Sequence, residues 1–255
     1  MFNWFKKERL VFDIATVSDR GLARPDNQDH ILSRPDLRVF AVADGMGGGQ
    51  GGALASSIFC HVLASKVKAG MSFSARVSAV SAAFTQANLD IRQAARDAGY
   101  EQMATTGSVL LLDENSKTAL IGYLGDSRIY CYRNNQLTCL TRDHTLASEL
   151  RSQSGEVTRN ATIDRKSAIG HVLTRALGAV LKIEPDWSRL SFKPGDAFLL
   201  CSDGVTDMLR DVNIALVFNL GQSAEDILKR LELAVRNAGA LDNYSMIVIK
   251  TELQR

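Results

Sequence analysis

The order of short apolar runs is the feature that most narrows what this 255-residue chain can fold into. Eight runs of four to six residues are separated by polar or turn-forming segments, a pattern typical of strands. Asn134-Asn135 lies between two runs and predicts a tight hairpin turn, because Asn tolerates a positive φ. Gly125-Asp126 is interpreted as the turn of the preceding pair. The expected strands are residues 12–17, 39–43, 108–112, 119–124, 128–132, 137–140, 197–201 and 245–249.

Between the second and third runs the apolar period changes to that of a helix. Residues 52–69 contain no proline and predict one helix. Residues 73–97 predict a second, in which apolar side chains recur every three or four positions. A later helix is expected to begin at Ser223, with Asp226 as its capping-box partner, and to end at Gly239. The apolar face of the second helix consists of Val77, Val80, Phe84, Ala87 and Ile91.

Two consecutive helices inside a series of strands do not fit the alternation of a doubly wound parallel sheet. They favour an α+β layered domain with mainly antiparallel sheets. The length suits one domain, expected over residues 11–255 after an N-terminal extension of residues 1–10. The polar stretch within residues 145–172 is predicted to form a surface flap.

The composition argues against several kinds of partner. The formal net charge is only +2, so no strong attraction to nucleic acid or to a membrane surface is expected. No apolar run approaches the roughly 18 residues of a membrane span, and residues 1–10 lack the apolar core of a signal peptide. The four cysteines form no CxxC pair, which favours a reduced, cytoplasmic protein. A monomer is the default expectation.

Five aspartates fall at the ends of the expected strands. Asp44 and Asp203 each follow an apolar run and precede a glycine, while Asp29, Asp126 and Asp242 lie next to other runs. A single Asp-Gly after a strand is usually no more than a turn. Several carboxylates that met at one edge of a sandwich would repel one another unless hard divalent cations, such as Mg²⁺ or Mn²⁺, bound between them. A glycine after the aspartate would let a backbone carbonyl approach such an ion.

The motifs around these residues resemble those of the type 2C family of metal-dependent serine/threonine protein phosphatases, in its bacterial form. The resemblance extends from about residue 13 to residue 249. One motif alone is a weak signal, but the whole set in the family's order is a strong one. The matching segments are Arg24-Pro-Asp-Asn-Gln-Asp29, Val42-Ala-Asp-Gly-Met-Gly-Gly48, Thr105-Thr-Gly107, Gly125-Asp-Ser-Arg-Ile-Tyr130, Leu140-Thr-Arg-Asp-His-Thr145, Leu173-Thr-Arg-Ala-Leu-Gly178, Leu200-Cys-Ser-Asp-Gly-Val-Thr-Asp207 and Asp242-Asn-Tyr-Ser245.

This resemblance implies a four-layer αββα sandwich, with two mainly antiparallel sheets flanked by helices. It also implies a binuclear centre of two Mn²⁺ or Mg²⁺ ions at one end of the sheets. Asp44 would bridge both ions, and Gly45 would donate its carbonyl oxygen. Asp203 and Asp242 would bind one ion directly, while Asp29 would support the second, partly through water.

Further implications concern the reaction and its partners. Asp126 would help to hold a third, weaker metal ion, and Arg24 would grip the substrate phosphate with its planar fork. The implied reaction is hydrolysis of phosphoserine and phosphothreonine in other proteins by metal-activated water. The implied partners are these phosphorylated proteins and a serine/threonine kinase. No Cys-x₅-Arg phosphate loop is present, which excludes the cysteine-based alternative.

Two positions depart from the family pattern. Gln28 stands where the first motif commonly has glutamate, so the second metal site loses a charge. Met46 stands where animal members have a histidine proposed as general acid, which leaves the proton donor unassigned. The four histidines show no metal-ligand spacing, although His144 is expected to order a loop near the site. Arg128 is interpreted as structural.

Two other functions were weighed against this one. Residues 47–52 satisfy the GxGxxG pattern of a dinucleotide-binding turn, but the chain continues into a second helix instead of the expected second strand. The alternative kept open is a catalytically weak, phosphoprotein-binding relative of the same fold. Such a relative usually loses metal ligands, whereas Asp44, Asp203 and Asp242 are all present.

Overall fold

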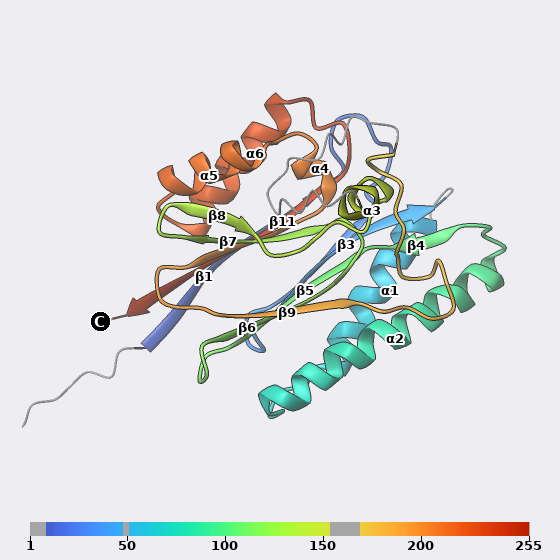
Figure 1. The fold of residues 1–255 in the computed structure, drawn as a ribbon, viewed down its shortest axis with the longest axis horizontal. Helices are drawn as coiled ribbons and strands as arrows, with labels where there is room; N and C mark the ends of the chain where they lie inside the picture. The colour runs from blue at the N-terminus through green and yellow to red at the C-terminus, as the bar shows by residue number, and fades with distance from the viewer. Residues whose placement is uncertain (1–8, 48–50, 154–168, 255) are drawn as a thin grey trace, which may run out of the picture.

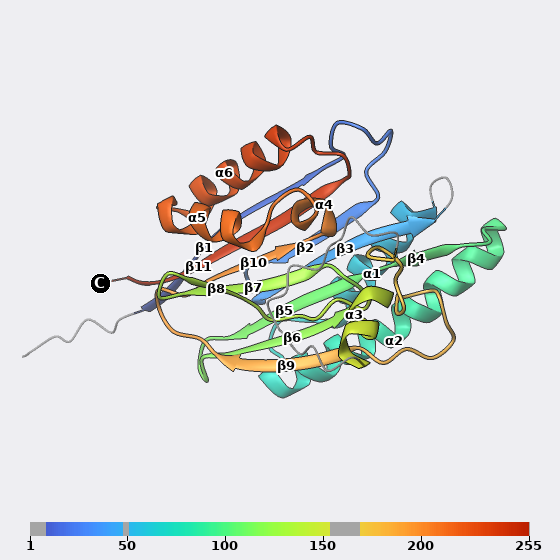
Figure 2. The same ribbon diagram turned by 45° about the horizontal axis from the view of Figure 1, so that its top comes forward.

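The computed structural model describes residues 9–47, 51–153 and 169–254. Within them the chain forms two sheets packed face to face, with helices on both outer faces (Figure 1). Figure 2 separates the layers, with α5 and α6 on one side of the sheets and α1 and α2 on the other. The predicted α+β class and the αββα sandwich are therefore confirmed.

Each sheet joins segments that are far apart in the sequence. The strand order is β1-β11-β10-β7-β8 in the first sheet and β2-β3-β5-β6-β9 in the second, where β4 pairs with β3. All of these described pairings are antiparallel. The strands of the first sheet are β1 (Arg9–Asp19), β7 (Arg128–Arg133), β8 (Gln136–Cys139), β10 (Ala197–Cys201) and β11 (Tyr244–Gln254). Those of the second are β2 (Asp29–Arg34), β3 (Val39–Gly47), β4 (Met103–Thr105), β5 (Gly107–Asp113), β6 (Thr118–Leu124) and β9 (Asp186–Ser191).

The helices begin and end at residues suited to their caps. The Ser72 side chain accepts a hydrogen bond from the Ala75 amide at the start of α2, which ends at Gly99 with a φ of 70°. Ser223 caps α6 as predicted, by accepting from the Asp226 amide. The helices are α1 (Gly51–Lys66), α2 (Phe73–Ala98), α3 (Leu146–Gln153), α4 (Asp203–Thr206), α5 (Asp211–Leu220) and α6 (Ala224–Asn237).

The strand β3 shows how the layers are held together. Ala41 and Ala43 pack with Phe59 of α1 on one face. Phe40 and Val42 face the sandwich interior on the other. Successive side chains of a strand point to opposite faces, so both faces of β3 are buried and its sequence is apolar without alternation.

One predicted turn is wrong and one is confirmed. Asn134 and Asn135 have φ values of 51° and 63° and join β7 to β8 as a tight hairpin. Gly125-Asp126 does not turn a hairpin, because β6 belongs to the second sheet and β7 to the first. The chain crosses between the sheets at this point. Asp126 is thereby placed at the junction of both sheets.

Several elements were not predicted from the sequence. The strand β4 has three residues, and β9 alternates partly buried with exposed side chains at a sheet edge. Neither length nor pattern identifies them locally. The helix α5 has apolar residues on its exposed face as well as its buried one, which hides its period. No helix of the described residues is both long and apolar enough to cross a membrane.

Candidate active site

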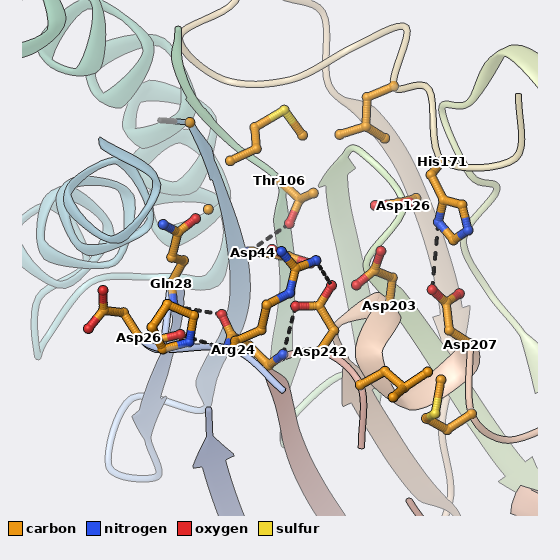
Figure 3. A pocket seen from close by; sticks show the side chains of 18 residues that line it. Arg24, Asp26, Gln28, Asp44, Thr106, Asp126, His171, Asp203, Asp207 and Asp242 are labelled. Carbon is orange, nitrogen blue, oxygen red and sulfur yellow. Dashed lines mark hydrogen bonds and ion pairs between the residues drawn. The ribbon is translucent and has the colours of Figure 1, made fainter. Parts of the chain in front are cut away.

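A cleft of about 880 Å³ opens at the end of the sandwich opposite the C-terminus. It is lined by six of the seven predicted site residues, which come from both sheets and from the crossover between them. Figure 3 shows Arg24, Asp44, Asp203 and Asp242 gathered in the middle of this cleft. The six predicted residues are Arg24, Asp44, Gly45, Asp126, Asp203 and Asp242.

The main chain of Asp44 is fixed by two threonines. Its amide donates to Oγ1 of Thr106 at 2.9 Å, and its carbonyl accepts from the Thr106 amide at 2.9 Å. The Thr105 hydroxyl adds a bond of 3.0 Å to the same carbonyl. Burial and the neighbouring charges of Asp29 and Asp203 raise the pKa of Asp44 well above its usual range. The main chain of Asp44 is therefore firmly held, and a positive charge nearby would favour the ionised form of its carboxyl group.

Asp29 lies beneath the cleft and does not line it. It pairs with Asp44 across β2 and β3 and is only 4% exposed. Ser202 donates to Oδ2 at 2.7 Å, whereas Oδ1 has no hydrogen-bond partner among the described residues. Burial raises the pKa of Asp29 to about 7 against the opposing hydrogen bonds of Ser202 and Ser245. An orphaned carboxylate oxygen beside a second carboxylate fits the hydrated shell of a hard cation.

The glycines that follow two of the aspartates permit close packing of the main chain. A Cβ on Gly45 would lie 2.0 Å from the carbonyl oxygen of Gly52. A Cβ on Gly204 would lie 1.9 Å from the carbonyl oxygen of Asn243. The second contact brings α4, which starts at Asp203, against the start of β11 and therefore beside Asp242.

Arg24 lies over the carboxylates on the loop between β1 and β2. Its Nη2 atom is 2.7 Å from Oδ2 of Asp242, and 56% of its side chain is exposed. The hydrogen bond and charge of Asp242 raise the pKa of Arg24, so it is a permanent cation. Among the described residues that line the cleft, it is the one arginine or lysine beside six aspartates: Asp26, Asp44, Asp126, Asp203, Asp207 and Asp242.

Asn243 holds the Arg24 loop in place and was not predicted as a site residue. Its Nδ2 donates to the carbonyls of Arg20 and Asp26 at 2.9 and 2.8 Å. Its Oδ1 accepts from the Gln28 amide at 2.8 Å. Three bonds from one side chain thus tie this loop to the start of β11. One hint was present, since Asn243 directly follows Asp242 in the sequence.

His171 and Asp207 are further cleft residues that sequence reasoning missed. Nδ1 of His171 is 3.6 Å from Oδ2 of Asp207. With Asp203 they offer three ligand atoms within 4.8 Å of one another. Asp207 follows Asp203 by four residues, a spacing that places two side chains on one side of a helix and could have been recognised. The four histidines show no metal-ligand spacing in the sequence, yet the fold places His171 at the cleft.

Other predicted features lie around or outside the cleft. Gln28 and Met46, which depart from the family pattern, both line it. Arg128 does not line it and instead forms a bidentate pair with Asp143, in agreement with a structural role. The flap was predicted over residues 145–172, of which residues 154–168 lie outside the described residues. So do residues 48–50 of the glycine-rich stretch.

The donor set of the cleft suits hard divalent cations. Carboxylates and a backbone carbonyl are the ligands that Mg²⁺ and Mn²⁺ favour. Such cations would also favour the charged forms of Asp29 and Asp44, whose pKa values are raised first by burial and then by neighbouring carboxylates. With a forked arginine at the rim, the cleft can bind a dianionic phosphate next to cations.

Comparison with known sequences finds protein phosphatases. A sequence model of the family described as protein phosphatase 2C matches residues 20–239. The serine/threonine protein phosphatase PstP of Mycobacterium tuberculosis is 32% identical over 243 residues. These residues are 94% of this chain but 45% of that relative, so the chain spans less than half of its length.

Solved structures agree with the sequence comparison. PppA, described as a key regulatory component of T6SS in Pseudomonas aeruginosa, superposes with a TM-score of 0.84 at 30% identity. The match covers 95% of this chain and 100% of that one. The catalytic domain of PstP, in complex with two manganese ions, gives a TM-score of 0.78 at 29% identity. That match covers 96% of this chain and 100% of the other.

Proposed function

The chain belongs to the protein phosphatase 2C family, and from this premise we propose that it hydrolyses phosphoserine and phosphothreonine in other proteins in a metal-dependent reaction. One observation carries the proposal. Asp44 of β3 meets Asp203, at the start of α4, and Asp242, just before β11, in a cleft with Arg24 at its rim. The PstP neighbour with two manganese ions supports divalent cations at this position.

We propose that the cleft holds two Mn²⁺ or Mg²⁺ ions. Asp44 would lie between them, with the Gly45 carbonyl on one side, and Asp203 and Asp242 would bind one ion. Asp29 would accept hydrogen bonds from the hydrated shell of the other through its orphaned Oδ1. When bound, the ions supply Lewis acidity that activates water and offsets charge on the phosphoryl group.

A third, weaker cation is proposed at the edge of the cleft. Asp126 would help to hold it, as the sequence resemblance implies, and we propose Asp203 as a second ligand. Asp207 and His171 lie close enough to Asp203 to contribute. The proton donor to the leaving oxygen stays unassigned, because Met46 offers no acidic proton at the position used by animal relatives.

Arg24 is proposed to bind and orient the substrate phosphate. The Arg24 loop is fixed by Asn243, and its guanidinium has N–H groups beyond the one that contacts Asp242. A planar fork can grip two phosphate oxygens at once, which aligns the phosphoryl group for in-line attack. The residue thus orients the substrate without forming a covalent bond to it.

The setting of the enzyme is also a proposal. We place the catalytic domain at residues 11–255 and expect it to act as a monomer in the cytoplasm on phosphorylated proteins, a partner kinase included. The four cysteines form no disulfide, as is usual in a reducing compartment. The regulatory role stated for PppA supports a signalling function. The near-neutral net charge does not favour nucleic acid or membranes as partners.

The test is hydrolysis of a phosphothreonine peptide by the purified protein, with added Mn²⁺ and with chelator. We expect activity that requires the metal and falls at least about a hundredfold in Asp203→Asn, because a metal ligand is lost. Asp36→Asn is the matched control, since this aspartate pairs with Arg34 on the surface and its side chain is 59% exposed. A folded protein that shows no turnover would favour the phosphoprotein-binding alternative, with Gln28 as the first suspect.

A further inference from the structure

His144 is a buried titratable residue that the proposed mechanism does not use. It lies in the loop before α3, is only 2% exposed and does not line the cleft. The aromatic ring of Tyr123 stacks on its imidazole with a centroid distance of 5.2 Å. Both ring nitrogens are hydrogen-bonded, so His144 does more than pack against its neighbours.

The first ring nitrogen binds the turn that carries Asp126. Nδ1 accepts a hydrogen bond from the Gly125 amide at 3.0 Å. The His144 amide in turn donates to the Gly125 carbonyl at 3.0 Å. Both polar main-chain groups of Gly125 are thus held by one residue. Gly125 has a φ of 106°, a conformation disfavoured for residues with a Cβ, so this turn requires a glycine.

The second ring nitrogen contacts Asp186, the first residue of β9. A backbone N–H can only donate, so Nδ1 is unprotonated and Nε2 carries the proton. Nε2 lies 3.3 Å from Oδ2 of Asp186, which also pairs with Arg175 at 2.7 Å. Burial, helped by the positive charge of Arg175, lowers the pKa of His144 to about 4. The imidazole is therefore neutral and its tautomer is fixed.

The main chain of His144 and its neighbour holds a wall of the cleft. The Thr174 amide donates to the His144 carbonyl at 2.8 Å, and the Leu146 amide donates to the Val172 carbonyl at 2.9 Å. The segment so attached carries His171 and Leu173, which both line the cleft. One buried residue therefore touches the Asp126 turn, this wall and the Arg175–Asp186 pair.

We propose that His144 is a positioning residue, which through Gly125 fixes Asp126 for the weak third cation. This inference rests on the proposed function, because it takes Asp126 to be a metal ligand. Residues that orient metal ligands from behind commonly change metal affinity by about 10- to 100-fold when they are removed. The hydrogen bond that Nδ1 accepts from Gly125 positions Asp126. The hydrogen bond from Nε2 joins His144 to the Arg175–Asp186 pair.

Two substitutions separate these bonds. In His144→Asn the amide oxygen can take the place of Nδ1 and accept from Gly125, while the reach to Asp186 is lost. In His144→Gln the longer amide can reach Asp186, but no acceptor faces Gly125. Asp126→Asn supplies the reference for direct loss of the ligand.

The measurement is Mn²⁺ binding, followed by the electron paramagnetic resonance signal of free Mn²⁺, with unfolding temperature recorded for each variant. We expect His144→Gln to weaken the weak site about tenfold and leave the tight sites unchanged. His144→Asn should stay within about twofold of the unsubstituted protein. Adding His144→Gln to Asp126→Asn should cause no further loss, because both act on one site.

Equal losses in folded His144→Asn and His144→Gln would overturn the inference, as would losses at all sites that follow the fall in unfolding temperature. Either result would make His144 a core residue only. If His144→Gln does not fold, loss of the weak site in folded His144→Asn overturns the inference by itself. Absence of tight Mn²⁺ sites in the unsubstituted protein would instead refute the proposed function, and the inference with it.

Discussion

Buried carboxylates occur in two settings in this fold, at the cleft and in the arginine pairs of the first sheet. Asp143 is 6% exposed, and Arg128 binds both of its oxygens at 2.9 and 2.7 Å. Arg133 grips Asp196 in the same way, at 2.8 and 2.6 Å. Beneath the cleft, Asp29 is buried to a similar degree, but one of its oxygens has no hydrogen-bond partner in the part of the chain that the structure describes, and its strand neighbour is a second carboxylate.

The presence or absence of a paired arginine distinguishes the structural carboxylates from those near the cleft. An arginine placed in the fold neutralises Asp143 and Asp196 permanently, which ties neighbouring segments together. Among the described residues that line the cleft, six aspartates share one arginine, Arg24, so the cleft suits a cation that arrives from solution. Substituting each group should therefore have opposite effects on stability and on metal binding.

The largest expected effect is loss of Mn²⁺ binding and of phosphatase activity in Asp44→Asn. We expect a fall in activity of at least about a hundredfold, because the carboxylate that we propose holds both ions is removed. Unfolding of the metal-free variant should occur at the same urea concentration or a higher one, since a crowded carboxylate is gone. A destabilised metal-free variant would show that Asp44 is structural, like Asp143.

Asp143→Asn should give the opposite result. Removing one partner of a buried pair leaves Arg128 with only its longer ion pair to Asp211, at 3.8 Å, and we expect a loss of about 3 kcal/mol in the free energy of unfolding. Tight Mn²⁺ sites should persist in the folded fraction. Urea unfolding with and without Mn²⁺ measures both quantities. A neutral effect on stability would remove the contrast between the two settings.

The stability of the metal-free protein should depend on pH through Asp29. The folded pKa of Asp29 is raised to about 7, whereas an unfolded aspartate titrates near 4. The folded metal-free protein thus binds more protons between about pH 4 and pH 7, so its stability should fall as pH rises through this window, by roughly 3 kcal/mol. Asp29→Asn should flatten this slope. Bound Mn²⁺ should reverse it, because metal ligands must be deprotonated.

The smallest expected effect concerns Arg24→Lys. The charge is kept but the bidentate fork is lost, so kcat/KM for a phosphopeptide should fall about tenfold. Stability should not change measurably, because the side chain is largely exposed. Arg34→Lys is the control, since Arg34 pairs with Asp36 away from the cleft. Equal activity in Arg24→Lys and the unsubstituted protein would exclude a forked grip on phosphate.

The sequence allowed much of the fold and most of the site to be predicted, because the signals are local. All eight expected strands lie on or overlap strands of the structure. Asp44 and Asp203 were found because each follows an apolar strand and precedes a glycine. The Gly125-Asp126 turn was misassigned because a crossover between two sheets looks like a hairpin turn from its residues alone.

The parts that were missed depend on contacts between distant segments. Asn243 reaches a loop more than 200 positions earlier in the chain, at Arg20 and Asp26. Thr106 supports Asp44 across 62 positions. His171 lies beside Asp207, the residue that follows α4, a helix too short for a periodic pattern. These long-range contacts cannot be read from one sequence, although Asn243 directly follows Asp242 and Asp207 follows Asp203 by four residues.

The most direct measurement is calorimetric titration of the metal-free protein with Mn²⁺ at pH 7.5, a value chosen near neutrality, for the unsubstituted protein, Asp44→Asn and the surface control Asp36→Asn. We expect at least two bound ions in the unsubstituted protein and in Asp36→Asn, and loss of the tight sites in Asp44→Asn. Tight binding that survives in Asp44→Asn, or no binding in the folded unsubstituted protein, would contradict the conclusion that the cleft carboxylates are matched by divalent cations.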